Sequence, residues 1–237
     1  MKIMVRWLPP VMKTAIYRIM MRAKFLINNI IQLAYSNKYS YSEYNEDNLV
    51  ETLFSSEIGS YVDIGAGHPT IGSNTYYFYK KGWNGITVEP IRFQFFLHRL
   101  KRRHDIQLNV LVGENKQKTT FYEFNPTQYS TMSIIQYRKL INQGMKERKS
   151  YLLNSLSINE VLAKNLQPNY FLSIDCEGYD FEIINAINWD KIVKPKVILY
   201  ENLSDLDQAK HIATKLENQQ YTLTYTTPRN SIYLLNT

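Results

Sequence analysis

The sequence has 237 residues, of which 44% are hydrophobic, and this suits one domain of ordinary size with an appendage. Its single cysteine, Cys176, excludes an intramolecular disulfide and fits a reducing, cytosolic setting. The net charge of +7 comes from residues 1–42, which hold seven lysines and arginines and no acid, while the other 21 basic and 21 acidic residues cancel. A body without net charge argues against a nucleic-acid-binding protein built on a basic face.

Residues 1–40 form a basic extension, in which we predict an amphipathic helix from about Val11 to Tyr35. Charges and amides interrupt this segment too often for a transmembrane span, and it has no secretory cleavage site. Two interpretations stay open: an arm that packs on the body or on a partner subunit, and an interfacial helix on the anionic inner face of a membrane. We therefore expect a cytoplasmic protein, either free or peripheral on a membrane, and leave its oligomeric state open.

A short buried strand is predicted from Tyr61 to Ile64, and it runs directly into Gly65 and Gly67. Glycines at this point let the backbone turn sharply and approach a ligand without a Cβ in the way. Glu89 ends the next apolar run, roughly 20 residues further on, where a carboxylate is placed to bind two ribose hydroxyls. This pattern predicts a βαβ unit that binds a nucleoside.

The glycine spacing favours S-adenosylmethionine over a dinucleotide. A dinucleotide-binding fold has the pattern G-x-G-x-x-G, which lets a pyrophosphate lie on a helix N-terminus. Here Thr70 stands in place of the third glycine, which comes late, at Gly72. Asp63, two residues before the first glycine, would repel a pyrophosphate but suits the ammonium group of S-adenosylmethionine. The alternative is that these are turn glycines in an α/β domain without a ligand.

The body alternates predicted strands and helices, beginning with a helix within residues 42–54. After the first strand we predict helix 74–81, strand 85–88, helix 91–103, strand 106–112, edge strand 119–124, helix 157–165, strand 169–175, helix 179–186, strand 196–200, helix 205–219, and a hairpin of strands 221–225 and 232–235. This order predicts an α/β, Rossmann-like sheet over residues 41–237, mostly parallel with a C-terminal antiparallel hairpin. Ligands of such a sheet bind at the carboxyl ends of its strands, where four acids fall: Asp63, Glu89, Asp175 and Glu201.

The predicted helix 91–103 has an apolar side that we expect to pack inward, formed by Phe93, Phe96, Leu97 and Leu100. Its basic end is expected in solvent, with Arg99, Lys101, Arg102 and Arg103. The histidines on helices or at their ends are also expected at the surface: His98, His104 and His211. Asn109 or Leu111, near the carboxyl end of the following strand, is placed to contact adenine.

Residues 125–150 interrupt the alternation and resemble an insertion whose second half is helical and basic. Five basic residues there outnumber one acid, Glu147: Arg138, Lys139, Lys146, Arg148 and Lys149. One interpretation is a solvated surface helix. The other is a lid over the methyl acceptor, whose charges suit a phosphorylated or acidic substrate.

Three motifs together resemble the FkbM-type methyltransferases: Tyr61-Val-Asp-Ile-Gly-Ala-Gly-His-Pro, Gly82-Trp-Asn-Gly-Ile-Thr-Val-Glu-Pro90 and Leu172-Ser-Ile-Asp-Cys-Glu-Gly178. The resemblance extends in order over residues 40–235 and leaves out the basic extension. It implies a class I S-adenosylmethionine-dependent fold and O-methylation of sugars or other hydroxylated metabolites. By this likeness, Asp63, Gly65, Ala66 and Gly67 would line the methionine part of the cofactor and Glu89 the ribose. The stretch from Asp175 to Gly178 would face the methyl group and the acceptor.

Methyl transfer to a hydroxyl is an in-line displacement that is helped by a base that takes the proton. We favour Asp175 as this base, with His68 second and Glu177 as a further candidate, because all three follow strand ends. Asp175, Glu177 and Glu201 could instead hold Mg²⁺. Acids at adjacent strand ends permit a metal without requiring one, so we assign none.

Two other classes of function remain in view. A nucleotide-dependent sugar oxidoreductase or epimerase is disfavoured by Asp63, by the missing third glycine and by the lack of a Tyr-x-x-x-Lys pair. A non-catalytic adaptor, recruited to a membrane by the basic extension, would be free to lose the acids that this chain has kept. We expect a small-molecule or glycan acceptor, such as surface polysaccharide or lipid-linked oligosaccharide, and no nucleic acid.

Overall fold

The computed structural model describes residues 40–54, 58–165, 167–202 and 206–236. The predicted helix of the basic extension lies outside these residues and stays a prediction. Two sheets organise the described chain, one of seven strands and one of three. None of the helices in the described ranges has the length and apolar content needed to span a bilayer.

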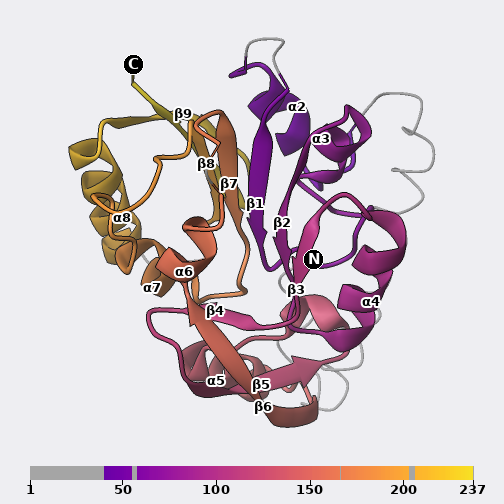
Figure 1. The fold of residues 1–237 in the computed structure, drawn as a ribbon. Coiled ribbons are helices and arrows are strands. Elements are labelled where there is room, and N and C mark those ends of the chain that lie inside the picture. Colours follow the sequence, from indigo (N-terminus) through magenta and orange to yellow (C-terminus); the bar gives the residue numbers. More distant parts are fainter. Residues whose placement is uncertain (1–39, 55–57, 166, 203–205, 237) are drawn as a thin grey trace, which may run out of the picture.

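The seven-stranded sheet has the strand order β3-β2-β1-β7-β8-β10-β9 (Figure 1). Its strands are β1 (Ser60–Ile64), β2 (Asn84–Val88), β3 (Ile106–Leu108), β7 (Tyr170–Ile174), β8 (Val197–Glu201), β9 (Tyr221–Thr226) and β10 (Asn230–Leu235). The first five strands of this order pair in parallel, while β10 is antiparallel to both β8 and β9. The mostly parallel α/β sheet with a C-terminal antiparallel hairpin is therefore confirmed.

Helices cover both faces of this sheet (Figure 1). One face carries α6 (Ile158–Leu162), α7 (Asp180–Asn185) and α8 (Leu206–Asn218), and the other carries α2 (Glu46–Glu51), α3 (Tyr76–Lys80) and α4 (Arg92–Lys101). Side chains along β1 alternate between the two layers, because successive residues of a strand point to opposite faces. Val62 packs with the α6–α8 core, whereas Tyr61 packs with residues of α2 and α3.

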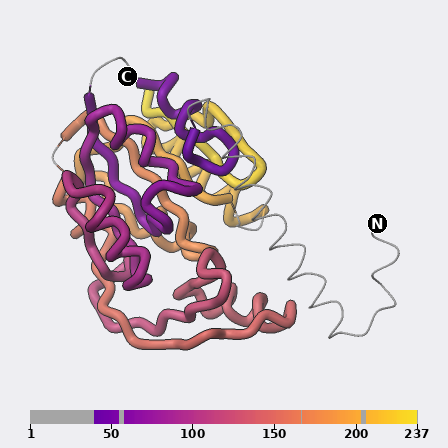
Figure 2. The backbone as a smooth tube through the Cα atoms, turned by 90° about the vertical axis from the view of Figure 1, so that its right-hand side faces the viewer, coloured from indigo at the N-terminus to yellow at the C-terminus, as the bar shows by residue number. Residues whose placement is uncertain are grey.

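The three-stranded sheet has the order β4-β6-β5 and lies at the lower end of the molecule (Figures 1 and 2). It consists of β4 (Leu111–Gly113), β5 (Lys118–Phe124) and β6 (Glu147–Ser157), with η2 (Thr127–Tyr129) and α5 (Ile134–Asn142) between β5 and β6. The prediction of one strand over 106–112 was wrong, because β3 and β4 belong to different sheets. The prediction that the second half of the insertion is helical was wrong from Glu147 onward. This part is strand β6, which pairs antiparallel with β5.

The predicted burial of the apolar side of α4 was wrong, although Arg99, Lys101 and Arg103 are exposed as predicted. Phe93, Phe96 and Leu100 are 68%, 55% and 48% exposed, whereas His98 and Arg102 are fully buried. The buried side is polar because it has partners: His98 Nε2 lies 3.0 Å from the carbonyl oxygen of Gly67, and Arg102 forms ion pairs. These anchors decide which side of the helix faces the sheet.

Candidate active site

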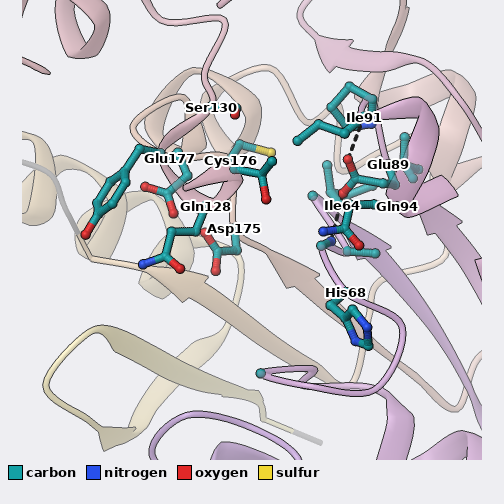
Figure 3. A pocket seen from close by; sticks show the side chains of 18 of the residues that line it. Ile64, His68, Glu89, Ile91, Gln94, Gln128, Ser130, Asp175, Cys176 and Glu177 are labelled. Carbon is teal, nitrogen blue, oxygen red and sulfur yellow. Dashed lines mark hydrogen bonds between the residues drawn. The ribbon is translucent and has the colours of Figure 1, made fainter. Parts of the chain in front are cut away.

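A cavity of about 350 Å³ opens at the carboxyl ends of β1, β2 and β7, between the large sheet and the small one (Figure 3). Small-molecule sites in proteins have volumes in this range. Most of the site residues predicted from the sequence line it, namely Gly65, Ala66, Gly67, His68, Glu89, Asp175 and Glu177. The topology brings them together because the ends of neighbouring parallel strands meet at one edge of a sheet.

Gly65 is required by the close approach of two strand ends. Its φ is +76°, and a Cβ at this position would lie 1.9 Å from the carbonyl oxygen of Asp175. Only glycine leaves room for the turn after β1 to pass against the end of β7. Gly67 also has a left-handed φ, of +57°, and its N–H points at Glu89.

Glu89 lies directly after β2 and holds the glycine turn. Its Oε2 accepts a hydrogen bond of 2.8 Å from the N–H of Gly67, and its Oε1 accepts one of 2.6 Å from the N–H of Ile91. Burial raises the pKa of Glu89 to about 8, although both backbone N–H groups favour the carboxylate. The carboxyl group is therefore fixed in direction at the cavity wall.

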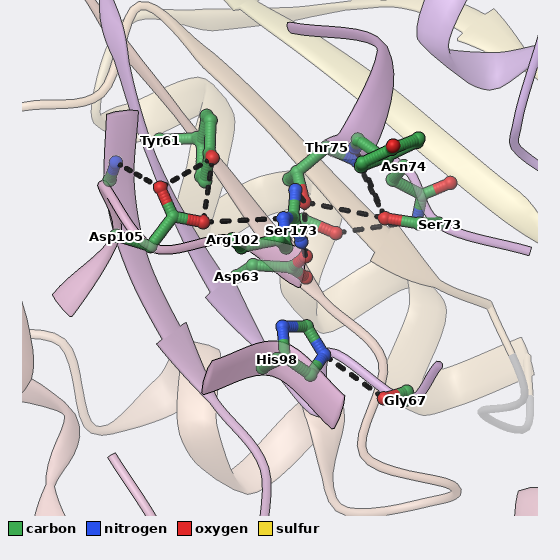
Figure 4. A network of polar contacts seen from close by, with 12 residues as sticks. Tyr61, Asp63, Gly67, Ser73, Asn74, Thr75, His98, Arg102, Asp105 and Ser173 are labelled. Atoms are coloured by element: carbon green, nitrogen blue, oxygen red, sulfur yellow. Dashed lines mark hydrogen bonds and ion pairs between the residues drawn. The ribbon is translucent and has the colours of Figure 1, made fainter. Parts of the chain in front are cut away.

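Asp63 and Asn109 are not among the residues that line the cavity. Asp63 is buried, and its Oδ2 accepts a hydrogen bond of 2.5 Å from the hydroxyl of Thr75 (Figure 4). Asn109 Nδ2 donates to the carbonyl oxygens of Glu89 and Pro90, at 2.8 and 3.0 Å. Both residues support the chain behind the cavity in this structure, and their predicted contacts with the cofactor stay predictions.

Arg102 is the centre of a buried polar network behind the glycine turn (Figure 4). Its guanidinium group donates to Thr75 Oγ1 at 2.6 Å and forms ion pairs with Asp105 at 3.2 Å and Asp63 at 3.8 Å. Tyr61 donates its hydroxyl to Asp105. The prediction that Arg102 and His98 lie in solvent was therefore wrong: one neutralises two acids, and the other holds the carbonyl group of Gly67.

A second polar group occupies the opposite wall, where β7 and β8 end. Asp175, Glu177 and Glu201 each place one carboxylate oxygen within 4.8 Å of the other two. Arg229, from the turn before β10, contacts Glu201 and lies 3.7 Å from Glu177. Burial raises the pKa of Asp175, Glu177 and Glu201, and the charge of Arg229 opposes that shift. A cation of the protein itself thus faces these acids, and we assign no metal.

His68 is bonded to its own loop. Its Nδ1 accepts hydrogen bonds from the backbone N–H groups of Thr70 and Ile71, at 3.2 and 3.1 Å. An Nδ1 that accepts leaves the proton of the neutral ring on Nε2, so neither nitrogen is free to take a further proton without losing these bonds. Burial lowers the pKa of His68, which keeps the ring neutral.

One comparison with known proteins shows the family of this chain. The family model for the methyltransferase FkbM domain matches residues 63–223. The chain belongs to the FkbM methyltransferase family. It is an S-adenosylmethionine-dependent methyltransferase, and the predicted family and cofactor are confirmed.

Solved structures with a similar chain path include two methyltransferases. A precorrin-6y C5,15-methyltransferase from Geobacter metallireducens is 13% identical, with 84% of this chain and 92% of that chain covered and a TM-score of 0.46. A TehB-like S-adenosylmethionine-dependent methyltransferase from Corynebacterium glutamicum is 8% identical, with 91% and 98% covered and a TM-score of 0.45. The comparison with curated proteins found no match.

The cavity of this FkbM methyltransferase fits its cofactor. The glycine turn brings backbone to the cavity with no Cβ at Gly65 or Gly67, and Glu89 places a carboxyl group one strand away. On the opposite wall, the Oδ1 atom of Asp175 is buried and makes no hydrogen bond within the described residues. We expect the glycine turn and Glu89 to hold S-adenosylmethionine and the wall at Asp175 to face the methyl acceptor.

Two cavity residues were missed by the sequence analysis. Glu43 and Arg229 line the cavity, although both lie many residues away from the three main motifs in the sequence. The first part of the predicted insertion also lines it, through Pro126, Thr127, Gln128, Tyr129 and Ser130. The basic part of that insertion turns elsewhere, since Arg148 and Lys149 form ion pairs with Glu123 at 2.8 and 3.3 Å. A role of residues 125–150 as a moving lid stays a prediction.

Proposed function

We propose that this FkbM methyltransferase methylates a hydroxyl group of a sugar or glycoconjugate, with Asp175 as the general base. The observation that carries this proposal is the position of Asp175. It follows β7, lines the cavity between the glycine turn and Arg229, and keeps one buried carboxylate oxygen without a hydrogen-bond partner among the described residues. When bound, S-adenosylmethionine supplies an electrophilic methyl group.

The environment of Asp175 suits proton transfer from an alcohol. Burial raises the pKa of Asp175, while the nearby charge of Arg229 and a hydrogen bond with Glu201 oppose this rise. A carboxylate with a raised pKa binds a proton more strongly than one in water and is the better base near neutral pH. Asp175 would therefore orient the acceptor hydroxyl and take its proton as the new bond forms.

Glu177 and His68 are weaker candidates for the base. Glu177 lies 3.7 Å from the guanidinium of Arg229, so its carboxylate already has a partner. His68 has Nδ1 engaged by two backbone N–H groups. We assign to Glu177 a role in binding the acceptor and to His68 a role in shaping the loop.

The cavity wall on the acceptor side favours a neutral, hydroxyl-rich molecule. Gln128 and Ser130 lie on the side of Asp175 and Glu177 (Figure 3), and the cavity lining also includes Asn230 and the apolar side chains of Phe121 and Met132. Amides and hydroxyls can hydrogen-bond sugar hydroxyls, and apolar faces can pack on sugar C–H groups. The acids of this wall outnumber Arg229, which disfavours the phosphorylated or acidic acceptor considered from the basic insertion.

The test is methyl transfer from labelled S-adenosylmethionine to a panel of neutral and anionic oligosaccharides, with the methylated atom identified by mass spectrometry and NMR. We expect the Asp175→Asn protein to bind S-adenosylmethionine within a few-fold of the unaltered protein and to lose roughly 10²- to 10⁴-fold in kcat. The matched control is Glu177→Gln, for which we expect mainly a higher KM for the acceptor. Normal turnover by Asp175→Asn, or a methyl group found on nitrogen or carbon, would contradict the proposal.

A further inference from the structure

Helix α4 presents an apolar stripe to the outside of the molecule. Phe93, Phe96 and Leu100 are 68%, 55% and 48% exposed. Their spacing of three and four residues places them on one side of the helix. Single exposed apolar residues are common, but two phenylalanines and a leucine in one stripe form a contiguous patch that needs an explanation.

The exposure of this stripe is built into the fold. The opposite side of α4 is held by His98, which contacts the carbonyl oxygen of Gly67, and by Arg102, which pairs with two buried acids. Rotating the helix to bury Phe93 and Phe96 would pull both groups away from their partners. The patch is therefore a fixed surface of the protein.

Basic side chains border the apolar stripe. Arg92 and Arg99 are exposed and lie seven residues apart, on the side of the helix next to the stripe, and Arg103 is exposed just after the helix ends. In residues 76–108, which run from α3 to the end of β3, the acids are Glu89 and Asp105, and both are buried. The surface around α4 thus combines an aromatic stripe with positive charge that no exposed acid of this segment offsets.

We propose that α4 docks the protein on an anionic lipid bilayer. Phe93, Phe96 and Leu100 would enter the interface, and the arginines would lie among the headgroup phosphates, as in interfacial amphipathic helices. Anionic lipid matches both halves of the surface, the apolar and the basic. A second copy of the chain matches less well, because a two-fold contact through α4 would bring the same three arginines together.

Docking through α4 has a consequence for the cavity. Ile91 and Gln94, at the start of the same helix, line the cavity, while Phe93 between them points to the outside. The bilayer would therefore lie beside one wall of the site. An acceptor held at a membrane surface could reach the cavity without leaving the lipid.

The test is flotation of the full chain with vesicles of phosphatidylcholine that contain or lack phosphatidylglycerol. We expect the unaltered protein to float with the anionic vesicles, and the double variant Phe93→Ser/Phe96→Ser to partition roughly tenfold or more weakly. Both side chains are exposed, so their loss leaves the core intact. Circular dichroism and binding of S-adenosylmethionine check the fold of each variant.

A matched pair of leucines controls for the loss of any exposed apolar residue. Leu206 is 80% exposed on α8, at the opposite side of the molecule from α4 (Figure 1). Leu100→Ser is expected to weaken flotation several-fold and Leu206→Ser to leave it unchanged. Equal effects of the two, or flotation of the double phenylalanine variant like the unaltered protein, would overturn the proposal.

Charge is tested separately with Arg99→Gln/Arg103→Gln. We expect this variant to lose several-fold in partitioning to anionic vesicles, and the loss to disappear at high salt, where headgroup charges are screened. If the unaltered protein did not float with anionic vesicles, the proposal would be overturned. The surface would then have to fit a different partner, such as an acidic protein or a nucleic acid.

Discussion

Two neighbouring arginines at the end of α4 have opposite environments. Arg102 is fully buried and neutralises Asp63 and Asp105, whereas Arg103 is exposed. We expect Arg102→Met to lower the free energy of unfolding by about 3–5 kcal/mol, because two buried carboxylates lose their counter-charge. Arg103→Met, the same change one residue later, should alter it by less than about 0.5 kcal/mol. Urea unfolding measures both, and equal losses would show that the network does not carry this stability.

Glu89 makes the stability of the protein depend on pH. Burial raises its pKa to about 8, from an ordinary value of 4.5. Between these values the folded protein keeps a proton that the unfolded chain has released, so the free energy of unfolding falls as the pH rises through this window. This contribution to stability is fully present below the ordinary pKa of 4.5 and is lost above the folded-state pKa of about 8.

Urea unfolding at pH about 7 and about 9 tests this dependence. His98 stays neutral in the folded protein over this range, because burial lowers its pKa to about 3. We expect the unaltered protein to lose about 1 kcal/mol more than Glu89→Gln over this range, since glutamine cannot titrate. Parallel losses in the two proteins would mean that Glu89 is already ionised in the folded state.

Among single residues, those that follow predicted strands could be found from the sequence. Gly65, Glu89 and Asp175 lie where a strand-end argument places them, because alternating strands and helices fix the edge at which they meet. Arg229 could not be found in this way. It reaches the cavity from a turn that carries no motif, and its contacts with Glu177 and Glu201 depend on the pairing of β10 with β8.

At the scale of elements, α6 shows what local sequence can determine. A capping box starts this helix: the N–H of Glu160 donates to Ser157 Oγ, and the N–H of Ser157 donates to the carboxylate of Glu160. Ser157→Ala should lower the free energy of unfolding by about 1 kcal/mol, because the first turn of α6 loses a partner for its N–H group. Ser150→Ala, on the exposed part of β6, is the control and should change little. Equal effects in urea would contradict a capping role.

The elements that local sequence did not determine depend on distant partners. β6 forms because it pairs along β5 and packs Tyr151 and Leu153 near Phe121, none of which is visible in the basic composition of residues 138–149. The side of α4 that packs on the sheet was predicted from its apolar residues, and this prediction was wrong. Partners for its polar side come from the glycine turn and from β1, which lie far away in the sequence.

At the scale of the whole molecule, the order of the elements was sufficient for the fold. Strands and helices that alternate, followed by a hairpin, leave few arrangements once crossovers are right-handed. The parallel strands and the antiparallel C-terminal hairpin were predicted from that pattern, whereas the order of the strands was not. The separate three-stranded sheet could not be predicted in this way. It forms because the chain leaves the first sheet after the three residues of β3 and enters the second sheet at β4.

Cofactor binding should stabilise the entire fold, since the cavity is built from both sheets and from the glycine turn. A ligand that binds only the folded state at about 100 times its Kd adds about 2.7 kcal/mol, which for a chain of this size corresponds to a rise in Tm of roughly 5–10 °C. We expect S-adenosylmethionine and S-adenosylhomocysteine to produce such shifts, with Kd values taken from calorimetry. Glu89→Ala at the same ligand concentration should shift several degrees less, because it loses a carboxylate at the cavity wall. NADH is the control, and a shift with NADH equal to that with S-adenosylmethionine would contradict the assignment of the cavity to this cofactor.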